Sequence, residues 1–193
     1  VEGSVVGDLT DRMELSKYPV AGGLSLHEAM HARYSTSDLS DVRKRMSSSA
    51  FSLFELLEEL RVEGRGVLSF PLDAGYLRAS TRTLLMEDGP ENWSNRGTAV
   101  LLVGREHVGV LEKADILPLE SYLLRQDGWT VRILNQMREV ISEFVMLEDS
   151  GAGLDRQIEL AEELDTILPR DPQTLEEALI ELVGDILASA ERG

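Results

Sequence analysis

The sequence predicts a mainly α-helical protein with a small β component. Apolar residues recur at helical spacing along several segments, most clearly over 49–63, where leucines and phenylalanines follow one another at steps of three residues. Residues typical of helix starts and stops bound many of these segments. Two short segments, 66–70 and 18–21, favour an extended backbone. We therefore expect helices to form most of the fold.

A capping box predicts where the first helix begins. The Ser25 side chain can accept a hydrogen bond from the first turn, and Glu28 stands three places later, as a capping box requires. We therefore expect a helix over 26–34. The next helix should begin near Ser49 and end at about Glu63, since two glycines lie just beyond it.

Later segments also have the apolar spacing and the boundaries of helices. They cover 76–87, 119–124, 131–147 and 154–168. A final amphipathic helix should begin at Asp171, because the proline that follows fits the first position of a helix. The apolar segment 98–103 predicts either a buried strand or a helix. The serine-rich segment 35–49 predicts a polar connection with a short helix inside it.

Composition excludes several classes of function. The 193 residues carry a formal net charge of -16, which repels phosphate backbones, so we expect no nucleic-acid partner. Without cysteine, the chain cannot form thiolate metal sites or use a cysteine nucleophile. No apolar run approaches the length of a membrane span, and the first residues lack the features of a signal peptide. We therefore expect a cytoplasmic protein without a membrane partner.

The strongest candidate site is the pentapeptide His-Glu-Ala-Met-His at residues 27–31. On a helix, His27 and His31 lie one turn apart on the same face, where both imidazoles can bind one metal ion. Glu28 follows the first histidine, and from there it can reach a metal-bound water. This is the HExxH arrangement of zinc peptidases, in which the glutamate is the general base. The alternative is that Glu28 only closes the capping box and both histidines are surface or packing residues.

A catalytic zinc site also needs a third protein ligand and an open position for water. The chain has three histidines, and the remaining one, His107, lies in a distant element. Residues 32–38 lack the glycine and histidine of the metzincin continuation, so that class is excluded. The other solution is a carboxylate on the next helix, within the segment Glu-Glu-Leu-Arg-Val-Glu at 58–63.

That segment resembles the second motif of gluzincin metallopeptidases. In this family a helical glutamate completes the zinc site, and an acidic residue four places later orients a ligand histidine. The resemblance implies that Glu59 is the third ligand and Glu63 the orienting acid, while Glu58 takes either role if the register shifts by one. The alternative is a solvated acidic helix face. Residues 18–65 are also similar to the metallopeptidase-like domains found beside von Willebrand A modules in cobaltochelatase-related proteins.

These resemblances imply zincin-like active-site helices followed by an α-helical C-terminal region. They predict a metallopeptidase core over 1–90 and a helical region packed on it over 91–193, unless the chain forms one single domain. The expected function is zinc-dependent hydrolysis of a peptide or protein substrate. The alternative is a non-catalytic helical scaffold with a vestigial or structural metal site, whose C-terminal helices bind a protein partner.

Two further features would belong to the substrate cleft. Gly22 and Gly23 would let an extended substrate approach the backbone, or they form a turn into the helix. A donor to the oxyanion is also needed, and spacing favours none of the candidates. The side chains chemically able to serve are Tyr34, Tyr76, Arg78 and His107.

Overall fold

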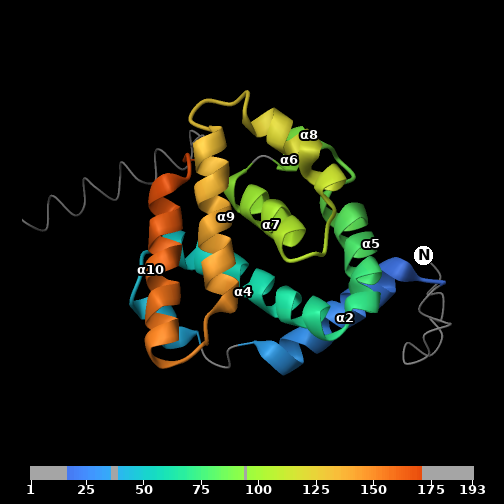
Figure 1. Ribbon diagram of the computed structural model, residues 1–193, viewed down its shortest axis with the longest axis horizontal. Coiled ribbons are helices and arrows are strands. Elements are labelled where there is room, and N and C mark those ends of the chain that lie inside the picture. The colour runs from blue at the N-terminus through green and yellow to red at the C-terminus, as the bar shows by residue number, and fades with distance from the viewer. Residues whose placement is uncertain (1–16, 36–38, 94, 171–193) are drawn as a thin grey trace, which may run out of the picture.

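The computed structural model describes residues 17–35, 39–93 and 95–170. Over these residues the chain forms α-helices and one short 3-10 helix and contains no strand, so the mainly helical prediction is confirmed and the small β component is wrong. The final helix expected from Asp171 onward lies outside the described residues. The helices of Figure 1 are α2 (Pro19–Tyr34), α3 (Ser40–Lys44), α4 (Ser48–Ser69), η1 (Pro71–Asp73), α5 (Ala74–Leu85), α6 (Pro90–Trp93), α7 (Arg96–His107), α8 (Lys113–Leu123), α9 (Val131–Met146) and α10 (Gly151–Ile167).

The helix that carries the two histidines, α2, begins at Pro19 rather than at the predicted residue 26. Proline fits this first position because its fixed φ suits a helix and its missing N–H would have no partner there. Ser25 therefore lies inside the helix, and the capping box predicted for Ser25 and Glu28 is wrong. We expected the segment 18–21 to be extended. Instead, Tyr18 is the N-cap of α2, and residues 19–21 are the first residues of the helix.

Two glycines that were expected to stop α4 lie inside it. The helix continues through Gly64 and Gly66 to Ser69, so the predicted stop and the predicted extended segment at 66–70 are wrong. A Cβ atom at Gly66 would lie 2.2 Å from the sulfur of Met30 in α2. This glycine therefore lets α2 pack closely against α4.

Apart from η1 and α6, which the sequence did not predict as helices, the remaining helices agree with the predictions except at their ends. The ambiguous segment 98–103 is helical and lies within α7. The helix expected at 119–124 begins earlier, at Lys113, because Glu112 and Asp115 form a capping box there. The short helix expected in the serine-rich connection is α3. The helices α5, α9 and α10 match the segments predicted at 76–87, 131–147 and 154–168.

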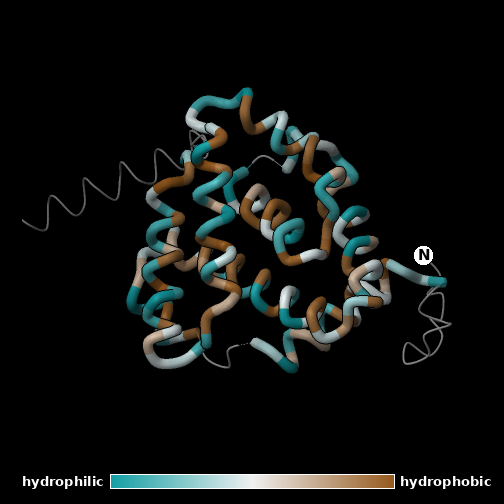
Figure 2. The backbone as a smooth tube through the Cα atoms, in the orientation of Figure 1, coloured by the Kyte–Doolittle hydropathy of each residue, from teal (hydrophilic) through white to brown (hydrophobic). Residues whose placement is uncertain are grey.

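α7 lies at the centre of the fold, in contact with α4, α8 and α9 (Figure 1). Its residues Ala99, Val100, Leu102 and Val103 are fully buried. Figure 2 shows hydrophobic and hydrophilic residues alternating along the helices, as expected of helices with one buried face. The main core combines α4 with α7, α8, α9 and α10, so segments before and after position 90 share it. Within the described ranges, no helix combines the length and the apolar character that crossing a membrane requires.

α2 and α5 also approach each other closely, and Gly23 is the point of contact. A Cβ atom at Gly23 would lie 2.2 Å from the backbone oxygen of Tyr76 and 2.5 Å from the hydroxyl oxygen of Ser80. Gly22 and Gly23 are both buried in the helix. They therefore form neither a substrate edge nor a turn, and their small size serves helix packing.

Replacing Gly23 with alanine should destabilise the fold, although alanine is the better helix former by about 1 kcal/mol. The added methyl group would overlap a backbone oxygen that moves only if α5 moves, and overpacking of this kind costs about 1–3 kcal/mol. Denaturant unfolding followed by circular dichroism measures the loss. Gly75→Ala is the matched control, since a Cβ atom at Gly75 meets nothing within 4 Å. Equal stability of the two variants would contradict the close contact.

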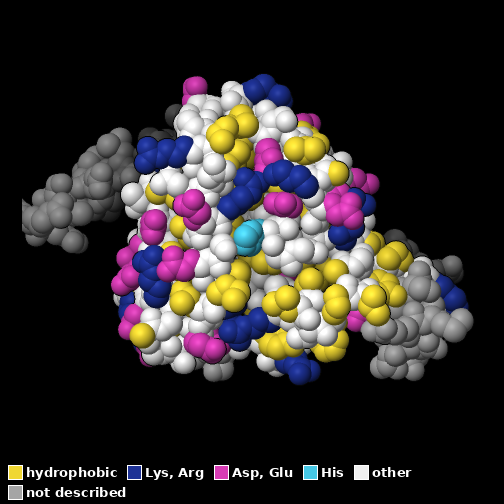
Figure 3. Space-filling view, in the orientation of Figure 1, with side chains coloured by type: hydrophobic (Ala, Val, Ile, Leu, Met, Phe, Trp, Pro, Cys, Tyr) yellow, Lys and Arg dark blue, Asp and Glu magenta, His cyan; other side chains and the backbone are white. Residues whose placement is uncertain are grey.

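Asp165 of α10 links that helix to α4 and α7. Its carboxylate accepts hydrogen bonds from the Ser49 hydroxyl at 2.7 Å and from the Arg96 guanidinium. Burial would raise the pKa of Asp165, but these two hydrogen bonds and the positive charges of Arg96 and Arg170 together outweigh it and hold the pKa below its ordinary value. Elsewhere, on the face seen in Figure 3, acidic and basic side chains lie intermixed in more exposed positions. Exposed pairs contribute little to stability, so the largely buried Asp165 contact matters more.

Asp165 should make stability depend on pH. Because its pKa is lower in the folded chain than in the unfolded one, the carboxylate stabilises the fold above about pH 4, and this contribution is lost as the pH falls through the folded-state pKa. Asp165→Asn should lower the free energy of unfolding by about 1–3 kcal/mol at pH 7. The difference between the two proteins should vanish as the pH falls. If the wild type and Asp165→Asn differ in free energy of unfolding by the same amount at all pH values, the stabilising role of the Asp165 carboxylate is contradicted.

Candidate metal centre

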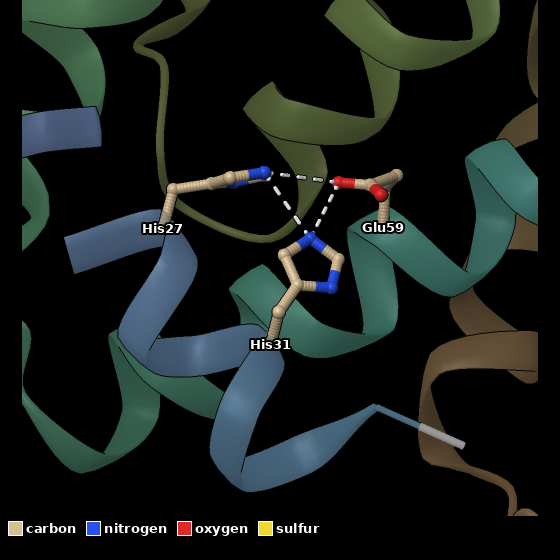
Figure 4. Close-up of side chains that lie close together, drawn as sticks. All are labelled: His27, His31 and Glu59. Carbon is tan, nitrogen blue, oxygen red and sulfur yellow. Dashed lines mark hydrogen bonds and ion pairs between the residues drawn. The ribbon is translucent and has the colours of Figure 1, made fainter. Parts of the chain in front are cut away.

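Two helices bring three candidate ligands to one point. His27 and His31 project from α2 and Glu59 from α4, and the three side chains point toward one another (Figure 4). The Nε2 atoms of the two histidines lie 3.1 Å apart. Oε2 of Glu59 lies 3.0 Å from Nε2 of His31 and 3.5 Å from Nε2 of His27. The three residues that the sequence predicted as ligands thus form one compact group.

Packing between α2 and α4 sets this geometry. Met30 is only 2% exposed and packs with Val62 of α4 in a small core cluster. Its sulfur occupies the space that the missing side chain of Gly66 leaves open. His27 and His31 lie on the same helix, three residues before and one residue after Met30, and both imidazoles point toward Glu59 of α4 (Figure 4).

The spacing of the donor atoms fits a small metal ion. Two ligands that each lie about 2.0–2.1 Å from zinc at the tetrahedral angle are about 3.3 Å apart. The three donor atoms are 3.0–3.5 Å from one another. Hydrogen bonds alone explain the group less well, because Nε2 of His31 contacts two possible acceptors and carries at most one proton. Two imidazoles and one carboxylate are also a donor set of catalytic zinc sites.

The ligand side chains are open to solvent on part of their surface. Those of His27, His31 and Glu59 are 23%, 26% and 32% exposed. A catalytic metal needs such access, because a water or a substrate atom must reach its remaining position. Within the described residues, these three side chains have donor atoms that lie close enough together to hold one metal ion.

Each imidazole uses its second nitrogen to contact the protein. Nδ1 of His27 lies 3.2 Å from Oε1 of Glu63, and Nδ1 of His31 lies 2.7 Å from the hydroxyl oxygen of Ser35. An ionised carboxylate only accepts hydrogen bonds, so His27 donates from Nδ1, and its neutral form then has a lone pair on Nε2. Glu63 thus contacts one of the candidate ligand histidines, where an orienting acid would have to lie.

Glu63 is buried between His27 and an arginine of the central helix. Its side chain is 1% exposed, and the Arg105 guanidinium donates to both of its oxygens at 2.8 and 2.6 Å. Burial would raise the pKa of Glu63, but the hydrogen bonds from His27 and Arg105 outweigh it and hold the pKa below its ordinary value. The hydrogen bond with Glu63 in turn raises the pKa of His27, against the opposing effect of burial.

Glu58 lies outside the metal centre. Its carboxylate accepts two hydrogen bonds of 2.6 Å from Arg61, which is fully buried. Arg61 also donates to the backbone oxygen of Tyr34 and to Asp149. Glu58 therefore holds the buried Arg61 in place, and Arg61 connects α4 to the end of α2 and to Asp149. Because Glu58 and Glu63 are both buried, the interpretation of this segment as a solvated acidic face is wrong.

Glu28, the expected general base, is exposed on α2 directly after His27. The four candidate oxyanion donors lie in different surroundings. The Tyr34 hydroxyl bonds to that of Ser69, Arg78 donates to the backbone oxygen of Val110, and His107 is exposed at the end of α7. The remaining candidate, Tyr76, is half-buried in α5 and lends its backbone oxygen to the contact with Gly23.

A cavity of about 180 Å³ adjoins the metal centre on the side of His27. Four leucines make its wall largely apolar, and Ser80 and Thr81 add hydroxyl groups. Glu63 and Arg105 line the same cavity, so the buried ion pair borders its space. The full lining is Leu24, His27, Glu63, Leu77, Ser80, Thr81, Leu84, Leu85 and Arg105.

Two contributors to the centre were not predicted from the sequence. Ser35 follows His31 by four residues, and this helical spacing could have indicated the contact. Arg105 is 42 residues from Glu63 in the chain, and no local pattern marks it. The sequence gives only an indirect signal for Arg105: a carboxylate that becomes buried needs a cationic partner somewhere in the chain.

The chain was also compared with known proteins. No family model, no curated protein and no solved structure matches it. The residues and geometry of the candidate metal centre are therefore the basis on which a function can be proposed.

Proposed function

We propose that this protein is a zinc-dependent peptidase in which His27, His31 and Glu59 hold the metal. The proposal is carried by the approach of their three donor atoms to within 3.0–3.5 Å of one another. Zinc bound by such residues supplies Lewis acidity, which polarises a carbonyl oxygen and lowers the pKa of a coordinated water toward neutrality. A catalytic role is favoured over a structural one, because structural zinc sites are closed by four protein ligands, whereas the described residues bring three to this point.

The residues of this chain would divide the remaining work. Glu28 would accept a proton from the attacking water and return it to the leaving amine. Glu63 and Ser35 would hold the two imidazoles through their Nδ1 atoms, so that each Nε2 atom faces the metal. The leucine-lined cavity beside His27 would accept an apolar side chain of the peptide substrate.

The first test is zinc binding. Protein purified without a metal-affinity step should contain about one zinc ion per chain by elemental analysis, as expected for a three-ligand site. His31→Ala and Glu59→Gln should each weaken zinc binding by more than about 100-fold, because even residues that only support a ligand contribute about 10–100-fold. Calorimetric titration of the zinc-free proteins measures this change.

Glu55→Gln is the matched control for the zinc titration. Glu55 is an exposed acid of α4, one helical turn before Glu59. The variant removes the same charge from the same helix and should bind zinc like the wild type. A wild-type protein without zinc, or equal losses in both glutamate variants, would contradict the proposed site.

The second test separates catalysis from a structural metal. Glu28→Gln should keep the zinc and lose about 10²–10⁴-fold in peptide hydrolysis, the usual contribution of a general base. Digestion of a peptide library, followed by mass spectrometry, compares the variant with the wild type. A wild type that binds zinc but cleaves nothing would instead support the non-catalytic scaffold. Unchanged cleavage by the variant would exclude Glu28 as the base.

A further inference from the structure

The candidate metal centre is connected to the central helix α7 through Arg105. This arginine donates hydrogen bonds to Glu63, and Glu63 in turn contacts the candidate ligand His27. We infer that Arg105 is a positioning residue of the centre: by holding both oxygens of Glu63, it keeps His27 in the tautomer whose Nε2 lone pair faces the metal position. This inference rests on the proposed metal site.

The geometry of the pair supports this role. Nε of Arg105 donates to Oε2 of Glu63 at 2.8 Å, and Nη2 donates to Oε1 at 2.6 Å. The two parallel bonds fix the plane of the carboxylate, which a single bond would leave free to rotate. The fixed Oε1 also lies 3.2 Å from Nδ1 of His27. The acceptor that orients the imidazole is therefore held in place by α7.

Arg105 is itself held firmly. Its backbone oxygen accepts hydrogen bonds from the backbone N–H groups of Val110 and Leu111 at 2.8 and 3.0 Å. The preceding residue, Gly104, allows close packing on α4, because a Cβ atom there would lie 2.1 Å from Cδ1 of Leu60. The arginine thus starts from a fixed backbone beside the helix that carries Glu63.

Lysine cannot reproduce this arrangement. A guanidinium is a planar fork that matches both oxygens of a carboxylate, whereas an ammonium is a point charge. Arg105→Lys keeps the charge but loses the fixed orientation. A requirement for orientation can therefore be separated from a requirement for charge alone.

The neighbouring cavity permits a rescue experiment. Arg105 lines this space of about 180 Å³, so Arg105→Ala enlarges a cavity that already adjoins the side chain. Ethylguanidinium can enter such a space and offer the same two donors to Glu63. Ethylammonium has similar size and the same charge but lacks the fork.

The experiment measures the tautomer of His27 and the affinity for zinc in the full chain. Long-range ¹H–¹⁵N spectra of the zinc-free protein report which ring nitrogen carries the proton. In the wild type this should be Nδ1 of His27, and in Arg105→Ala the population should shift away from it. The variant should also bind zinc about 10–100-fold more weakly, as is typical when a residue that supports a ligand is lost. Arg105→Lys should recover only part of the loss.

Two comparisons test the inference: chemical rescue of Arg105→Ala and a control variant of another arginine. Millimolar ethylguanidinium should restore the tautomer and the zinc affinity of Arg105→Ala, while ethylammonium should not. Arg138→Ala is the control, since Arg138 is a partly buried arginine of α9 that pairs with Glu120 and Glu106, and this variant should bind zinc normally. An unchanged tautomer in Arg105→Ala, or a loss that ethylguanidinium leaves in place, would overturn the inference.

The failure of the proposed function would look different. If the wild type binds no zinc, the proposed metal site fails, whereas the tautomer of His27 in the zinc-free protein still reports on Arg105. If the wild type binds zinc and Arg105→Ala binds it equally well, the site stands and the positioning role is overturned.

Discussion

The buried carboxylate of Glu63 is the interaction on which the arrangement of the centre depends. It comes from α4, receives two hydrogen bonds from Arg105 of α7, and contacts Nδ1 of His27 in α2. A carboxylate that is 1% exposed is tolerated only with such partners, because an unpaired buried charge is strongly unfavourable. The same contacts that satisfy this charge therefore connect the core to the helix of the two histidines.

The arrangement of the candidate ligands also depends on close packing between helices. The helix α2 lies against α4 and α5 through contacts that Gly66 and Gly23 make possible, and a Cβ atom at either position would overlap a neighbour. Met30 fills one of these contacts and is 2% exposed, and His27 and His31 on the same helix point toward Glu59 (Figure 4). A candidate metal centre with donor atoms 3.0–3.5 Å apart thus lies at the surface of a well-packed core.

The sequence predicted those parts of the fold and site that follow from helical periodicity. His27 with His31, and Glu59 with Glu63, stand four residues apart, so a helix alone places each pair on one face. The sequence did not predict the ends of α2 and α4, because Pro19 competes with the capping box at Ser25, and because tertiary packing keeps Gly66 inside a helix. Arg105 could not be found locally, since only the folded chain brings α7 to α4.

We propose that one metal ion lies between the two imidazoles and the carboxylate of Glu59. A crystal structure of the zinc-loaded protein, with anomalous data collected on both sides of the zinc absorption edge, tests it most directly. We expect one strong anomalous peak about 2.0–2.1 Å from Nε2 of His27, Nε2 of His31 and an oxygen of Glu59. A zinc-soaked crystal without a peak at this position, or with zinc bound only elsewhere on the acidic surface, would contradict it.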